Sequence, residues 1–126
     1  MNNKQKAFLY LAHLLVYSDG EYDEAEKDAI LRICEIEGIS IEEYQQFHLE
    51  SLDLSEREIF DNGVNLLEEC NDDEKIAVFV WLYKMSEVDG TVHAKEIRFL
   101  LYSLRRARLD LDIIEKAAKT APAIFL

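Results

Sequence analysis

Residues 7–26 read AFLYLAHLLVYSDGEYDEAE, an apolar run that stops at Asp19-Gly20 and is followed by Glu26. The same order recurs 70 residues further on, where residues 77–96 read AVFVWLYKMSEVDGTVHAKE and contain Asp89-Gly90 and Glu96. Each stretch predicts an apolar helix, a turn at the Asp-Gly pair and a second helix that begins near the Glu. We therefore expect an internal duplication of a helix, Asp-Gly turn, helix unit, packed about a pseudo-twofold axis.

The composition favours one all-α domain that spans residues 1–126. Hydrophobic residues make up 49% of the chain and charged residues 32%, a mixture typical of globular proteins. Only 4 Gly and 1 Pro are present, and helices tolerate few of either. A chain of 126 residues is long enough to bury a core as a single domain.

Capping patterns divide the chain into a bundle of about seven helices. In a capping box, an Asn, Asp, Ser or Thr before the helix and a Glu three residues later bond to each other's backbone N–H. The four matching pairs are Asp23 with Glu26, Ser40 with Glu43, Ser55 with Glu58, and Asn71 with Glu74. The helix after Ser55 is expected to continue through Gly63, and further helices are expected at about 93–106 and 110–119.

The charge limits the classes of partner. The net charge is −12, which repels nucleic acid and anionic lipid and favours cations or a protein with a basic surface. The apolar run at 7–17 is too short to span a membrane. Cys34 and Cys70 lie in apolar helical patterns without a CxxC spacing, so we expect buried free thiols and a cytoplasmic protein.

Residues 11–26, from Leu11 to Glu26, resemble the TerB-like tellurite-resistance family. The hallmark of that family is an apolar helix, a stretch of small residues, Asp-Gly and a Glu several residues on. Residues 82–96 resemble the same motif, and the resemblance extends over about residues 5–118. Tyr17-Ser18 and Ser86-Glu87 depart from the small residues of the motif.

The resemblance implies a bacterial cytoplasmic protein in stress or tellurite resistance, without an established catalytic activity. Related domains lie beside a DnaJ-type co-chaperone, which implies an adaptor role for a chaperone or a membrane-associated complex. Acidic clusters at the Asp-Gly turns are proposed cation sites in the family. Carried to this chain, that implies ligands at Asp19, Glu26, Asp89 and Glu96, although Lys95 beside the second turn opposes a cation.

Carboxylates crowd the first turn and suggest a site for Ca²⁺, Mg²⁺ or a similar divalent cation, because hard cations need several oxygen ligands. The candidate metal ligands are Asp19, Glu21, Asp23, Glu26, Asp89 and Glu96. The Asp-Gly-x5-Glu spacing matches half of an EF-hand loop, but Leu15 and Tyr17 fall where that loop needs oxygen ligands, so an EF-hand is excluded. The alternative is purely structural: Asp19 and Asp89 satisfy turn amides, and Glu26 caps a helix.

Other residue types give weaker indications. The three histidines, His13, His48 and His93, share no metal-ligand spacing and are expected to be structural or solvated. The group Arg105-Arg106-x-Arg108 suits a helix C-terminus, and could also bind an anion or an acidic partner. No catalytic triad or phosphate-binding glycine loop is visible, so we expect a protein that is not an enzyme.

Overall fold

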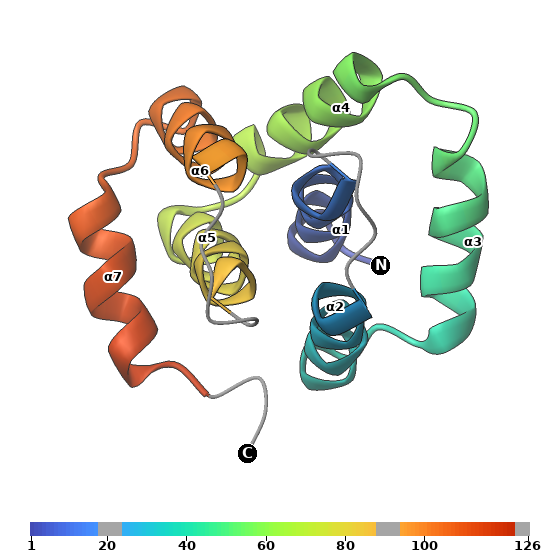
Figure 1. Cartoon of the computed structure of the whole chain (residues 1–126), viewed down its shortest axis with the longest axis horizontal. Helices are drawn as coiled ribbons and strands as arrows, with labels where there is room; N and C mark the ends of the chain where they lie inside the picture. The colour runs from blue at the N-terminus through green and yellow to red at the C-terminus, as the bar shows by residue number, and fades with distance from the viewer. Residues whose placement is uncertain (18–23, 88–93, 123–126) are drawn as a thin grey trace.

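The computed structural model describes residues 1–17, 24–87 and 94–122, and of Tyr17 and residues 94–97 it describes the backbone alone. Seven α-helices and no strand make up this part of the chain, which confirms the predicted all-α class (Figure 1). The helices are α1 (Asn3–Tyr17), α2 (Glu24–Glu37), α3 (Ile41–Ser51), α4 (Glu56–Glu68), α5 (Asp72–Ser86), α6 (Ala94–Arg106) and α7 (Leu111–Thr120).

The two most apolar helices, α1 and α5, pack against each other at the centre of the bundle. A helix that is apolar on nearly every side has to be covered on nearly every side. Eight residues of α1 are buried: Ala7, Phe8, Leu9, Leu11, Ala12, Leu14, Leu15 and Val16. The apolar helix expected before Asp19-Gly20 is thus a buried element at the centre of the bundle.

The remaining helices cover this pair unequally. α4 packs on α1, α6 and α7 pack on α5, and α2 contacts both central helices. α3 lies at the edge of the molecule and packs on α2 (Figure 1). Phe47 anchors α3, because its ring is 6% exposed and meets the Tyr10 ring edge-on, with 4.9 Å between centroids. One face of α3 is left without an intramolecular cover among the described residues.

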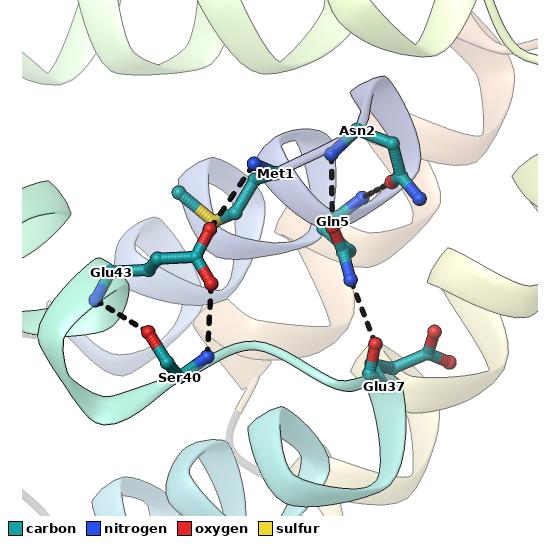
Figure 2. Close-up of polar contacts among 6 residues, drawn as sticks. All are labelled: Met1, Asn2, Gln5, Glu37, Ser40 and Glu43. Carbon is teal, nitrogen blue, oxygen red and sulfur yellow. Dashed lines mark hydrogen bonds and ion pairs between the residues drawn. The ribbon is translucent and has the colours of Figure 1, made fainter.

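Capping boxes begin α3, α4 and α5 as predicted, at Ser40, Ser55 and Asn71. α1 begins with one more box that the sequence analysis missed. The Asn2 N–H donates to Gln5 Oε1 at 2.9 Å, and the Gln5 N–H donates to Asn2 Oδ1 at 2.8 Å (Figure 2). The predicted box of Asp23 with Glu26 lies partly outside the described residues, because Asp23 is not among them.

Two helices end in the same way, with residues that lie 70 positions apart. Gly38 follows α2 with φ +77°, and Arg108 follows α6 with φ +61°. In both places the next N–H donates to a carbonyl five residues back, at 2.8 Å for Ile39 and 3.0 Å for Leu109. Glycine adopts this left-handed conformation freely, but a residue with a Cβ loses about 1 kcal/mol there. The bundle therefore tolerates backbone strain at Arg108.

α4 runs through Gly63 without a break, as predicted. α1 lies directly against that residue. A Cβ on Gly63 would lie 3.1 Å from the Cβ of Tyr10 and 3.1 Å from Cδ2 of Leu11. The Tyr10 Cβ is fixed to its backbone and can yield only if α1 moves. Gly63 thus sets how closely α1 and α4 approach.

We predict that Gly63→Ala destabilises the protein. Overpacking at a tight contact costs about 1–3 kcal/mol, more than the roughly 1 kcal/mol that alanine gains in helix propensity. The expected net loss of about 1 kcal/mol lowers Tm by roughly 4 °C for a domain of this size, as measured by calorimetry. Asn65→Ala, at an exposed position of the same helix, is the control and should not lower Tm. A Gly63→Ala protein at least as stable as wild type would contradict the prediction.

Candidate functional site

Of the six predicted cation ligands, Glu26 is the one whose side chain the structure describes. Asp19, Glu21, Asp23 and Asp89 lie outside the described residues, and of Glu96 only the backbone is described. Glu26 lies in the first turn of α2, is 3% exposed and has an interaction partner. By contrast, Glu43, Glu58 and Glu74, the three glutamates in the described capping boxes, are half-buried or exposed. Glu26 is therefore a deeply placed carboxylate beside the first Asp-Gly turn.

Within the described ranges, no three His, Cys, Asp or Glu side chains come together in a way that could hold a metal ion. The predicted cation site at the Asp-Gly turns, which falls mostly outside those ranges, stays a prediction.

Acidic side chains concentrate on α2, α3 and the segment that follows α3. Residues 24–54 contain nine Asp or Glu and two Lys or Arg, a balance of −7 out of −12 for the chain. Three of these carboxylates form ion pairs with described residues: Glu35 with Arg32, Glu37 with Lys4, and Glu43 with the Met1 α-amino group. Five exposed carboxylates form none with the described part of the chain: Glu24, Asp28, Glu42, Glu50 and Asp53.

The junction between α2 and α3 is tied to the start of α1 and to α5. The Glu37 carboxylate accepts the Trp81 Nε1–H at 2.8 Å. Its backbone carbonyl accepts the Gln5 Nε2–H at 2.7 Å (Figure 2). Glu43 accepts from the Ser40 N–H and from the Met1 amino group, at 3.1 and 3.2 Å. These two donors lower the pKa of the Glu43 carboxyl, the Ser40 N–H having the larger effect. The start of α3 is thus fixed in position.

An apolar groove lies between α2 and α3. The α3 side presents Ile41, Tyr44, Gln45, His48 and Leu49, and the α2 side presents Lys27 and Leu31. The α3 residues recur at the helical spacing of one face, which Leu52 extends. Ile41, Leu49 and Leu52 are 57%, 60% and 65% exposed, although aliphatic side chains of this size are usually buried. No described carboxylate lines the groove itself, but exposed Asp28 and Glu42 lie one helical turn before Leu31 and Gln45, on the same faces of their helices.

His48 lines this groove, and His13 lies next to His48. His13 of α1 and His48 of α3 have ring centroids 6.1 Å apart, and both line a small cavity of about 10 Å³ together with Tyr44. Burial lowers the pKa of His13 from its usual value, and the positive charge of His48 lowers it further. Residues with no metal-ligand spacing in the sequence thus become neighbours in the fold.

We predict that the free energy of unfolding falls as the pH drops below about 6.5, the usual pKa of histidine. Between that value and the lower native pKa of His13, the unfolded chain binds a proton that the native protein does not, so acidification favours unfolding. Urea titrations between pH 5 and 7.5 measure the slope of the free energy of unfolding against pH. His13→Gln should flatten it, and His48→Gln, which removes only the lesser cause, should flatten it less. An unchanged slope in His13→Gln would refute the assignment.

A second cavity, of about 400 Å³, lies where the ends of α4 and α6 meet the start of α5. Three cationic side chains line it, Lys75, Arg106 and Arg108, against one carboxylate, Glu68, and we call it the basic cavity. None of these four side chains has an ion pair or hydrogen bond with a described residue. Ser103 also lines the cavity; it is 1% exposed, and its Oγ has no hydrogen-bond partner in the described structure. A buried hydroxyl without a partner costs about 1–3 kcal/mol.

The cysteines are buried and free, as predicted. Burial raises the pKa of Cys34 to about 11 and is the main cause of the raised pKa of Cys70. The thiolate is the nucleophilic form, so neither thiol is suited to nucleophilic catalysis.

Comparison of the chain with protein-family models, with curated proteins and with solved structures finds no match. The described helices include none with the length and apolar character needed to cross a membrane.

The sequence analysis missed the α2–α3 groove and the Ser103 hydroxyl in the basic cavity. The repeat of residues at 41, 44, 48, 49 and 52, apolar except for His48, was the available signal for the groove, since it marks one face of a helix. Whether that face is buried depends on which helix covers it. The group Arg105-Arg106-x-Arg108 was noted as a helix end or anion site, and the structure brings Arg106 and Arg108, but not Arg105, to the basic cavity.

Proposed function

We propose that the protein is a non-enzymatic, cytoplasmic interaction module whose α2–α3 groove binds a basic amphipathic segment of a partner protein. The carrying observation is the groove itself, which exposes Ile41 and Leu49 within a segment whose exposed carboxylates, such as Asp28 and Glu42, have no ion-pair partner in the described structure. A partner helix that inserts apolar residues at every third or fourth position would fill the groove. Lysines and arginines beside those residues would meet the carboxylates.

Charge complementarity selects this partner over a second copy of the chain. Two copies, each with a net charge of −12, would repel each other. The acidic residues 24–54 of one copy, with a charge balance of −7, would lie against the same residues of the other. Like charges held together oppose association, whereas opposite charges accelerate it. A role in stress response, beside a chaperone or a membrane-associated complex, is the biological setting that the TerB-like resemblance suggests, and we propose it on that ground.

We predict that a designed 18-residue helical peptide, with Leu at every third or fourth position and Lys elsewhere, binds the protein in a fluorescence anisotropy titration. Leu49→Ser should weaken this binding about tenfold, because burying a leucine side chain contributes roughly 1.5–3 kcal/mol and 1.4 kcal/mol is tenfold in Kd. Leu49 is exposed, so the substitution should leave the fold unchanged.

Leu101→Ser is the matched control, since Leu101 is 45% exposed on α6 and lies away from the groove. It should leave the Kd unchanged, and a peptide with Glu in place of Lys should not bind. If the Lys peptide binds Leu49→Ser as tightly as wild type, the groove is not the site; if it binds no form of the protein, the proposed function fails.

We further propose, as the second candidate function, a weak divalent-cation site at the Asp-Gly turns. The observation that favours it is the burial of Glu26 beside the first turn, where a carboxylate benefits from a nearby positive charge. The equivalent helix starts, Glu24 for α2 and Ala94 for α6, support the proposal that the two turns belong to a duplicated unit. Oxygen ligands from both turns could then serve one cation.

We predict that millimolar Ca²⁺, Mg²⁺, Mn²⁺ or Zn²⁺ raises Tm relative to EDTA, because an ion that binds the native state stabilises it. Asp19→Asn/Asp89→Asn should abolish the increase. Asp53→Asn/Asp112→Asn, which removes the same charge from exposed positions outside the turns, should retain it. If no ion raises Tm in wild type, or if both double variants respond alike, a cation site at the turns is excluded. The acidic residues of the turns then have a structural role only.

A further inference from the structure

The end of α6 differs from the end of α2 at two equivalent positions, and both differences face the basic cavity. The tenth residue of α2 is Ile33, fully buried in the core. The tenth residue of α6 is Ser103, equally buried, whose hydroxyl has no partner among the described residues. The left-handed residue after α2 is Gly38, whereas after α6 it is Arg108. Each replacement is unfavourable for folding, and together they place a hydroxyl and a guanidinium at one cavity.

The cations of this cavity are not used elsewhere in the described structure. The carbonyls of Ser103, Leu104 and Arg105 at the end of α6 already accept N–H donors from residues 107–109. The cationic side chains are therefore not needed to cap the helix. Lys75, Arg106 and Arg108 leave the cavity with a local balance of +2 after Glu68 is counted, in a protein whose net charge is −12.

We infer that this basic cavity binds a small molecule that carries a phosphate group. Arginine presents a planar set of N–H donors that matches phosphate oxygens, lysine adds a point charge, and the Ser103 hydroxyl supplies a buried donor. The Glu68 carboxylate would accept a hydrogen bond from a hydroxyl or amino group of the same ligand. The volume of about 400 Å³ suits a small organic phosphate, and the acidity of the whole chain disfavours a nucleic-acid backbone as the source of the phosphate.

The decisive variant is Arg108→Gly, because strain and binding predict opposite effects on Tm. In phosphate-free buffer, glycine relieves the left-handed strain, so this variant should melt above wild type. Titration with inorganic phosphate or glycerol 3-phosphate, against NaCl of equal ionic strength, should raise the Tm of wild type in a saturable way and leave Arg108→Gly nearly unchanged. Glycerol 3-phosphate should bind more tightly than inorganic phosphate if the rest of the cavity contributes.

A matched pair of charge variants separates the cavity from the general basicity of the helix end. Arg106→Gln should weaken glycerol 3-phosphate binding at least tenfold in isothermal calorimetry. Arg105→Gln removes the same charge one residue earlier, outside the cavity lining, and should leave binding unchanged. Ser103→Ala should weaken binding several-fold. The inference is overturned if phosphate gives no increase beyond that of NaCl, if Arg108→Gly responds as wild type does, or if Arg105→Gln and Arg106→Gln lose affinity equally.

Discussion

The architecture depends on the need to cover α1, a helix that is apolar around nearly its whole circumference. α2, α4 and α5 supply that cover, and Gly63 lets α4 come within contact of the α1 backbone region at Tyr10. Because α4 occupies one side of α1, α3 lies at the margin and reaches α1 through ring contacts of Phe47 and His48 with Tyr10 and His13. α7, which begins 70 residues after α3, instead packs along α5. The groove on α3 follows from this inequality.

Polar contacts then determine where the marginal helix sits. Glu37 joins the end of α2 to Lys4 and to Trp81, and Glu43 joins the start of α3 to the beginning of the chain. Both groups act at the same corner, next to the start of α1 (Figure 2). A corner held by several charge-assisted bonds sets where α3 starts relative to the end of α2. The apolar groove lies between the two helices that meet at this corner.

Local features of the fold could be predicted from the sequence, because they depend on residues a few positions apart. The boxes at Ser40, Ser55 and Asn71, the continuation of α4 through Gly63 and the burial of both cysteines are of this kind. The α2–α3 groove and the basic cavity could not be predicted in this way. Leu31 and Leu49 line one groove, and Ser103 and Lys75 line one cavity, only because different helices pack together. The left-handed conformation of Arg108 was equally hidden, because the residue type argues against it. The Asp-Gly turns, the most prominent signal in the sequence, remain a prediction.

The hydrogen bond from Trp81 to Glu37 has a practical consequence. Trp81 is the one tryptophan of the chain, lies on α5 with 5% of its surface exposed, and is bonded to the end of α2. Its emission therefore reports the contact between the two sides of the bundle rather than the exposure of the molecule as a whole. Excitation at the indole band would detect a parting of α2 from α5 as a red shift, and would do so even while both helices remained intact. The fold thus contains its own optical probe of motion between its two sides.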